Sequence, residues 1–119
     1  MKQQSLFVHA LRHPSSREEA FARLVSEYKE RLYWHIRKIV LDHDDANDVV
    51  QNTFIKVHLN IENFKENSTL FTWIYRIATN EALNFITSKA KKMGLQNQEW
   101  VEALADGLEA DSYFDGDEA

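Results

Sequence analysis

The sequence contains no cysteine, only one proline and only three glycines in 119 residues. The absence of cysteine excludes disulfide bonds, thiolate zinc sites and cysteine nucleophiles. Because the first glycine is Gly94, the residues before it contain no glycine-rich phosphate-binding loop. Tight turns between strands usually need glycine, and residues 15–93 have neither glycine nor proline. This composition predicts an all-α protein in which polar loops join the helices.

Long apolar runs and an N-terminal signal are also missing. No stretch approaches the roughly 18 apolar residues that cross a bilayer. The polar residues 1–5 lead into an apolar segment that is too short for a signal peptide. We therefore expect a cytoplasmic protein with no membrane insertion.

Basic residues are missing from the C-terminal segment 99–119, which contains eight acids. The 19 acids of the chain less these eight leave 11 in residues 1–98, against all 14 basic residues, which is a net charge of +3. The overall charge of −5 therefore comes from the C-terminal segment, and it does not exclude an anionic partner for the rest of the chain.

Apolar residues at helical spacing predict a first long helix after Pro14. Ser16 and Glu19 have the spacing of a capping box at its start. Its apolar face consists of Phe21, Leu24, Val25, Tyr28, Leu32, Ile36, Ile39 and Val40. A shorter helix over residues 4–11 is predicted to precede it.

A second helix is predicted from near Asp44, after an acidic run at 42–45 that is suited to cap it. Its apolar stripe consists of Ala46, Val49, Val50, Phe54, Val57 and Ile61. Residues 55–61 also alternate as a strand would, but no partner strand is visible in the sequence, so we favour the helix. In a helix, Ile55 and Leu59 cover a second side.

A third helix is predicted from a cap at Ser68 or Thr69 to about Lys92. One face, away from its apolar residues, carries Trp73, Arg76, Asn80 and Asn84. An aromatic ring, a guanidinium and amides in a row are able to stack on bases, pair with phosphate and hydrogen-bond base edges. Positive charge near the end of the helix comes from Lys89, Lys91 and Lys92. The spacing alone leaves open the alternative of a solvated face with Trp73 folded into the core.

The remaining polar residues fit ordinary structural roles when only their spacing is considered. On the polar side of the second helix, Asp48, Gln51 and Asn52 are able to bind a partner helix, as polar residues of any surface helix are. The pair Asp44 and Asp45 resembles a helix cap more than a general acid/base pair. Surface or edge positions, rather than metal ligation, are expected for His9, His13, His35, His43 and His58. We therefore expect no metal and no cofactor.

Three motifs in the right order resemble a known family. Residues 48–57, D-V-V-Q-N-T-F-I-K-V, resemble the D-V-V-Q-E-T-F-L-K-V run of bacterial extracytoplasmic-function (group 4) sigma factors. Downstream, T-W-I-Y-R-I-A-T-N-E-A-L at 72–83 looks like their T-W-L-Y-R-I-A-x-N-x-A-L segment, and F-x-x-L-V-x-x-Y at 21–28 also fits. The resemblance covers roughly residues 17–93, which correspond to the domain called region 2 of the sigma-70 family.

The resemblance implies a compact three- to four-helix bundle that directs RNA polymerase to promoters and performs no covalent chemistry. In the family, the second helix docks on the clamp helices of the polymerase β′ subunit. Asp48 and Gln51 match that surface, whereas Asn52 stands where the family more often has an acid.

The resemblance also implies contact with the promoter's minus-ten element through the third helix and the loop before it. In the family the non-template strand is melted, and one base is flipped into a pocket that this loop forms. Here the loop is 61–69, and its implied DNA-contacting residues are Asn63, Phe64, Lys65, Asn67 and Ser68. The helix face is implied to hold the strand at the fork through Trp73, Arg76 and Asn80, with Asn84 beside them. The implied phosphate ligands are Lys56, Lys89, Lys91 and Lys92.

Two departures from the family pattern affect these expectations. The family often has an acid at position 84 and arginines from position 87 onward, so the modestly basic run 88–92 implies a low affinity for duplex DNA. Family members also carry a second, helix-turn-helix domain, for which 119 residues leave no room. We therefore expect an excised domain or a truncated family member.

The expected organisation is an N-terminal extension (1–14), a sigma region 2 domain (15–94) and the acidic start of an interdomain linker (95–119). The implied partners are the RNA polymerase core through its β′ clamp helices, the non-template strand of promoter DNA and an anti-sigma factor, with a monomer outside the polymerase. One alternative is a sigma-like interaction module that binds polymerase or an anti-sigma factor without reading DNA. Another is a small metal-dependent helical enzyme that uses the histidines.

Overall fold

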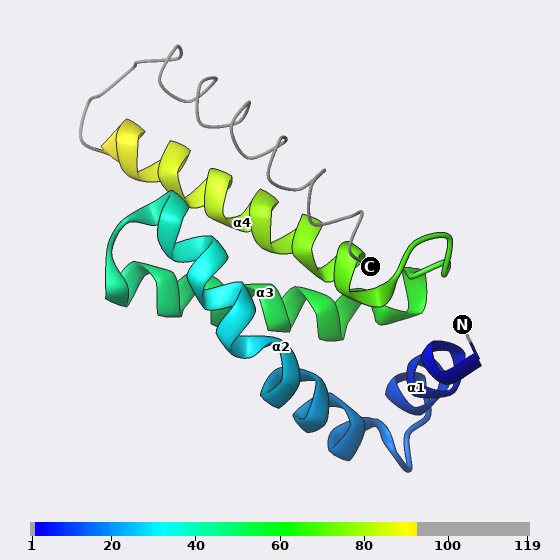
Figure 1. The fold of residues 1–119 in the computed structure, drawn as a ribbon. Helices are drawn as coiled ribbons and strands as arrows, with labels where there is room; N and C mark the ends of the chain where they lie inside the picture. The colour runs from blue at the N-terminus through cyan, green and yellow to red at the C-terminus, as the bar shows by residue number, and fades with distance from the viewer. Residues whose placement is uncertain (1, 93–119) are drawn as a thin grey trace.

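A computed structural model describes residues 2–92, and within this range all regular elements are helical. The order is α1 (Lys2–Arg12), α2 (Arg17–Val40), α3 (His43–Asn60), the short 3₁₀ helix η1 (Ile61–Asn63) and α4 (Leu70–Lys92). Figure 1 shows α3 and α4 running alongside each other with α2 crossing them. The all-α prediction is confirmed, whereas the predictions for Gly94 and the acidic segment 95–119 concern residues outside this range.

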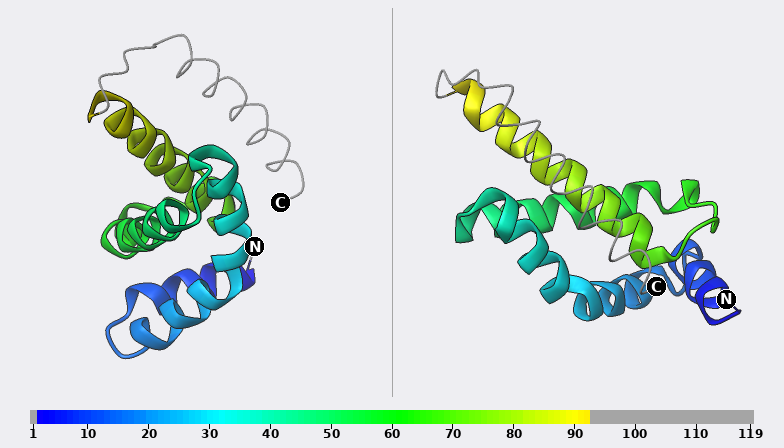
Figure 2. Two further views of the ribbon diagram at one scale, coloured as in Figure 1. Left: turned by 90° about the vertical axis from the view of Figure 1, so that its left-hand side faces the viewer. Right: turned by 45° about the horizontal axis from the view of Figure 1, so that its top comes forward.

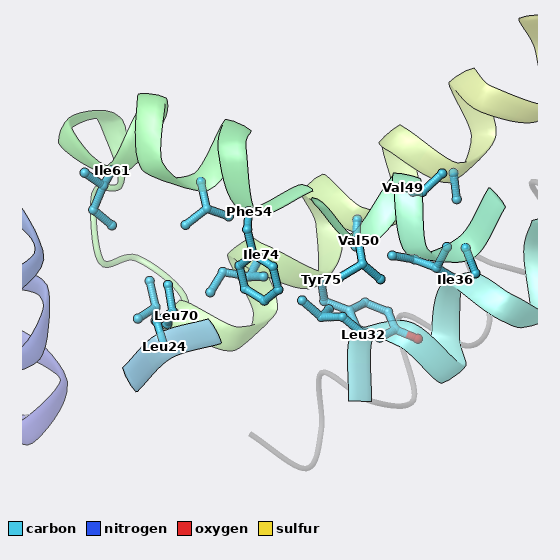
Figure 3. Packing of buried hydrophobic residues seen from close by; sticks show 14 of the residues in the cluster. Leu24, Leu32, Ile36, Val49, Val50, Phe54, Ile61, Leu70, Ile74 and Tyr75 are labelled. Carbon is cyan, nitrogen blue, oxygen red and sulfur yellow. The ribbon is translucent and has the colours of Figure 1, made fainter. Parts of the chain in front are cut away.

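The core lies between α2, α3 and α4, which pack against one another in pairs. Every residue of the predicted α3 stripe, from Ala46 to Ile61, is buried. Figure 3 shows Leu32 of α2, Val50 of α3 and Tyr75 of α4 meeting in this core. Since α3 continues as one helix to Asn60, the choice of a helix over a strand for residues 55–61 is correct up to that residue, after which η1 follows.

Short-range hydrogen bonds define the junction of α2 with α3 and the start of α4. Leu41 ends α2 in the left-handed region at φ 67°, and Asp42 then caps α3, because its Oδ2 accepts from the Asp45 backbone N–H at 2.9 Å. This backbone hydrogen bond lowers the pKa of the Asp42 carboxyl. At α4, Thr69 Oγ1 accepts from the Thr72 N–H at 3.1 Å. The caps predicted in the acidic run 42–45 and at Ser68 or Thr69 are confirmed. The cap role predicted for Asp44 and Asp45 is wrong, because α3 already includes both residues and Asp42 supplies the cap.

The predicted capping box at the start of α2 is wrong. Ser16 precedes the helix, but its side chain makes no cap hydrogen bond. Its hydroxyl donates instead to the backbone carbonyl of Ala10 in α1 at 2.9 Å. A serine hydroxyl bonds equally well to a backbone N–H or a backbone carbonyl, and here the turn back from α1 brings a carbonyl within reach.

The N-terminal helix α1 is packed onto the rest of the molecule. Its presence is as predicted, with one or two more residues at each end. Val8 and Leu11 are buried in the same core cluster as residues of α2, α3 and α4. Figures 1 and 2 show α1 lying at the end of the molecule where the loop between α3 and α4 runs. The N-terminal helix therefore belongs to the same packed body as the three long helices.

A buried polar contact joins α2 to α4. His35 is 5% exposed, and its ring stacks on Tyr75 with 3.9 Å between centroids. Nδ1 of His35 lies 2.8 Å from the Tyr75 hydroxyl, and Nε2 lies 2.8 Å from the Thr79 hydroxyl. The expectation of a surface histidine at position 35 is therefore wrong, because two hydroxyls from α4 satisfy both ring nitrogens inside the core.

Among residues 2–92, no helix combines the length and the apolar character that crossing a membrane requires.

Candidate nucleic-acid interface

The outer face of α4 presents its polar residues along one line. Arg76, Asn80 and Asn84 are exposed and follow one another at intervals of four residues, which places them on one side of the helix. Lys91 is also exposed and lies seven residues beyond Asn84, two turns further on the same side. Among residues 2–92 no carboxylate lies within ion-pair distance of Arg76. The guanidinium, two amides and an ammonium are thus presented to solvent together.

Trp73 stands at the start of this face and is half-buried. Its ring lies 5.1 Å from the Phe64 ring, with 39° between the planes. The two alternatives for this residue are therefore both partly correct: the indole packs against the molecule, but it keeps an accessible part beside the polar face.

The 61–69 loop places most of its polar side chains outward. Asn63, Lys65 and Asn67 are exposed, and Ser68 is half-buried. Glu66 adopts the left-handed conformation at φ 55°, which disfavours a non-glycine residue by about 1–2 kcal/mol. A strained residue of this kind persists only where surrounding contacts hold it, and such residues gather at binding sites.

Phe64 is the member of the implied DNA-contacting set that points inward. It is 3% exposed and belongs to the core cluster. From this position it supports Trp73 from beneath rather than meeting solvent. An aromatic residue in a polar loop is explained as well by packing as by base contact, so the sequence alone did not distinguish the two.

The four lysines of the implied phosphate set fall into two groups. Lys56 of α3 pairs with Glu81 of α4 at 2.6 Å, and Lys89 pairs with Asp45 at 2.8 Å. The hydrogen bond that Lys89 donates to the Asp45 carboxylate raises the pKa of the Lys89 ammonium. Both lysines therefore link α3 and α4 and are partly neutralised, while Lys91 and Lys92 are exposed in the last turn of α4.

The outer face of α3 carries the implied polymerase-binding residues. Asp48, Gln51 and Asn52 are all exposed. Ile55 and Leu59 continue the same side of the helix, and they are 55% and 70% exposed. The spacing of these two residues predicts a second side of the helix, but the sequence assigns no partner to it. Their spacing from Asp48 and Asn52 was the available signal.

His43 and His58 also have hydrogen-bond partners. His43 Nε2 accepts from the Asn47 amide at 3.2 Å, so the ring proton is on Nδ1, which lies 2.7 Å from the Tyr33 hydroxyl oxygen and donates to it. His58 Nδ1 lies 3.3 Å from the guanidinium of Arg17. In the part of the chain that the structure describes, no three histidine, aspartate or glutamate side chains gather as metal ligands do.

The fold and these surfaces define the class of the protein, which is a small all-α domain with its candidate binding groups on two helix faces and in one loop. Residues 24–92 match the family described as Sigma-70 region 2, and the chain belongs to this family. The match includes α3, the 61–69 loop and α4, while α1 lies before its first residue.

Individual relatives are similar over the same part of the chain. An ECF RNA polymerase sigma-E factor of Haemophilus influenzae is 39% identical over 75 residues, which is 63% of this chain and 39% of the relative. The RNA polymerase sigma-H factor of Pseudomonas aeruginosa is 36% identical over 75 residues, with the same two shares. The ECF RNA polymerase sigma factor SigW of Bacillus subtilis is 36% identical over 72 residues, 60% of this chain and 38% of the relative. The matches thus span about two fifths of the length of these relatives.

Proposed function

We propose that this chain is the part of an extracytoplasmic-function sigma factor that binds RNA polymerase and recognises the promoter minus-ten element. The observation that carries the proposal is the α4 face, on which Arg76 and Asn80 are exposed and follow the half-buried Trp73. This face adjoins the 61–69 loop through the contact of Trp73 with Phe64. Membership of the Sigma-70 region 2 family supports the same function.

The proposed mechanism is capture of an unpaired strand. Bases stack on the accessible part of Trp73, each base–aromatic contact contributing roughly 1–3 kcal/mol. Arg76 and Lys91 bind phosphates, and the exposed amides of Asn63 and Asn67 read the Watson–Crick edge of a flipped base. Flipping costs a few kcal/mol, and the loop contacts offset this cost. The domain traps the open strand, while the polymerase synthesises RNA.

The polymerase side of the proposal uses the outer face of α3. Asp48, Gln51 and Asn52 pair with polar groups on the β′ clamp helices, and Ile55 and Leu59 supply apolar contact area. An interface of this kind has apolar residues at its centre and polar residues at its rim. Exposed isoleucine and leucine side chains in line with an acid and two amides fit this arrangement.

The remaining parts of the proposal follow from these partners. The proposed place of action is the cytoplasm, and the chain is a monomer outside the polymerase that an anti-sigma factor is able to bind. The proposed organisation remains an N-terminal extension (1–14), a region 2 domain (15–94) and a linker start (95–119).

The proposal is tested by selecting strands from a single-stranded DNA library with a randomised hexamer on the full chain. We expect an enriched strand to bind better than its scrambled version in fluorescence anisotropy at low salt. Arg76→Ala should weaken binding of the enriched strand by about tenfold or more, because a hydrogen bond to a charged group contributes roughly 1.5–3 kcal/mol.

Arg23→Ala is the matched control, because it removes the same charge from α2, where the guanidinium lies 5.6 Å from the Phe7 ring of α1. Affinity for the strand should change little in this variant. Equal binding of enriched and scrambled strands, or equal effects of the two arginine variants, would contradict the proposed DNA recognition.

A second candidate function is a sigma-like module that binds polymerase or an anti-sigma factor without reading DNA. Two observations favour it: Lys56 and Lys89 are paired with carboxylates, and Ile55 and Leu59 form an exposed apolar stripe. Binding of a β′ clamp fragment together with an absence of strand preference would support this candidate over the first.

A further inference from the structure

We infer that α1 is a positioning element for the 61–69 loop, whose backbone is held at both ends by Gln4 and Arg12. The inference rests on the proposed function, because it assigns to α1 a part in deciding which nucleotide the loop accepts. The match to Sigma-70 region 2 begins at residue 24, so α1 lies outside the residues that define the family match.

Arg12 holds the first half of the loop. Its Nε donates to the carbonyl of Ile61 at 3.1 Å, and its Nη2 donates to the carbonyl of Phe64. The guanidinium is a planar fork with fixed donor directions, so two carbonyls bound to one fork are fixed relative to each other. These two carbonyls belong to the first residue of η1 and to its C-cap residue, which directly follows Asn63.

Gln4 holds the second end of the loop. Its Oε1 accepts from the Leu70 backbone N–H at 2.8 Å, and its Nε2 lies 3.4 Å from the Ser68 carbonyl, to which it donates. Leu70 is the first residue of α4, where backbone N–H groups have no partner within the helix. One amide therefore fixes the loop and the first turn of α4 together.

Ser5 adds a contact to the middle of the loop, between the segments that Arg12 and Gln4 bind. Its hydroxyl donates to the Glu66 carboxylate at 3.0 Å, and Glu66 is the residue in the left-handed conformation. Three residues of α1 thus contact the loop: Arg12 in the last turn of the helix reaches its beginning, and the neighbours Ser5 and Gln4 reach its middle and its end. The backbone of the loop is held by side chains that lie 49 to 66 residues away in the sequence.

The helix that provides these contacts is itself firmly placed. Val8 and Leu11 anchor it in the core, and the Ser16 hydroxyl binds the Ala10 carbonyl at its end. A rigid support matters because base readout depends on groups held in position before the ligand arrives. Loss of the hydrogen bonds from Gln4 or Arg12 leaves the loop free to accept other bases, while the proposed phosphate contacts of α4 stay in place.

The test uses Gln4→Met and Arg12→Met in the full chain. Methionine keeps the length of the glutamine side chain and replaces the apolar stem of the arginine side chain, and it removes the hydrogen bonds of both. The readout is the ratio of affinities for the enriched single strand and for strands with one base changed. We expect this ratio to fall about tenfold towards one, with affinity for the scrambled strand within about twofold of the original. Gln3→Met, at the exposed neighbouring position, is the matched control and should keep the ratio.

Arg12→Lys separates positioning from charge, because lysine keeps the positive charge but has no fork of donors. We expect an intermediate ratio for this variant. Circular dichroism and thermal melting establish that each variant is folded. If Arg12→Met does not fold, the affinity ratios of Gln4→Met and Arg12→Lys test the inference.

The outcomes distinguish the inference from the proposed function. If the original chain shows no preference among strands, the proposed DNA recognition itself fails. If the original chain discriminates among strands and the folded Gln4→Met and Arg12→Met variants discriminate equally well, the inference is overturned. An equal loss of affinity for enriched and scrambled strands would also overturn it, because that result indicates general damage rather than misplacement of the loop.

Discussion

The proposed docking surface on α3 comes from one regular helix, whereas the proposed DNA-binding surface of α4 and the 61–69 loop combines a helix with an irregular segment. Asp48, Ile55 and Leu59 keep their relative positions as long as α3 is helical. The loop is held by contacts with residues far away in the sequence, such as the Arg12 guanidinium on the Ile61 carbonyl and the packing of Phe64 in the core. One proposed binding surface is thus set by local structure, and the other depends on contacts between distant parts of the chain.

The two surfaces also differ in charge. Arg76 and Lys91 give the α4 face positive charge, while the α3 face combines the negative Asp48 with exposed isoleucine and leucine. Phosphate contacts weaken steeply with salt, and apolar contacts do not. The proposed DNA contact should therefore be the more salt-sensitive of the two.

The largest expected effect removes both surfaces at once. Ile74 of α4 is fully buried in the shared core, and Ile74→Ala should lower the free energy of unfolding by about 2–5 kcal/mol. Urea denaturation followed by circular dichroism measures this change. Leu59→Ala removes a similar side chain from an exposed position and should have little effect, so equal losses in the two variants would show that the assignment of the core is wrong.

A smaller effect should separate the surfaces. Leu59→Asp places a charge in the apolar stripe of α3 and should weaken binding of a β′ clamp fragment by about 1–2 kcal/mol, roughly tenfold. Affinity for the enriched single strand should not change.

The matched control is Leu6→Asp, because Leu6 is 65% exposed and belongs to α1 rather than to the helix that carries the proposed docking surface. Isothermal titration with the clamp fragment measures both variants. A similar loss of clamp binding in the two variants would contradict a docking site on α3.

The smallest expected effect concerns the N-terminal cap of α3, the helix that carries the proposed docking surface. The backbone N–H of Asp45 lowers the pKa of Asp42, so the ionised carboxylate stabilises the folded protein at neutral pH. Because the folded-state pKa lies below the unfolded one, this contribution is present above the unfolded pKa and is lost as the pH falls through the folded pKa. Asp42→Asn should lower the melting temperature slightly at neutral pH, and the difference should disappear in acid.

Asp42→Ala completes this experiment, because it removes the hydrogen-bond acceptor as well as the charge. The deficit of this variant should persist in acid. Melting curves across the acidic range measure both variants, and a difference for Asp42→Asn that grows as the pH falls would contradict the sign of the pKa shift.

The regular parts of the molecule could be predicted from the sequence. The absence of glycine and proline from residues 15–93, together with helical spacing, indicated the three long helices. The α3 stripe and the line of Arg76, Asn80 and Asn84 followed from the same spacing, because a helix fixes which residues share a face. A cap in the acidic run that includes Asp42 could also be predicted, because a cap is a contact between residues three apart.

The parts that could not be predicted depend on contacts between residues far apart in the sequence. Nothing near His35 in the sequence indicates that two α4 hydroxyls surround it, and the Ser16 hydroxyl binds a carbonyl that the turn from α1 brings close. Phe64 looked like a base-contacting residue because only the fold shows that it reaches the core. The hydrogen bonds of Gln4 and Arg12 to the loop could not be predicted from spacing, because 49 or more residues separate each side chain from its partner.

The central claim is that single-stranded DNA binds the α4 face and the 61–69 loop, while the polymerase clamp binds α3. The most direct test is backbone NMR of the ¹⁵N-labelled chain, titrated first with the enriched single strand and then with the β′ clamp fragment. The account predicts that the strand shifts amide signals of residues 61–69 and of the α4 turns around Trp73, Arg76 and Asn80, and that the clamp fragment shifts those of α3 from Asp48 to Leu59. Strand-induced shifts centred on α3, or no shifts at 61–69, would contradict it.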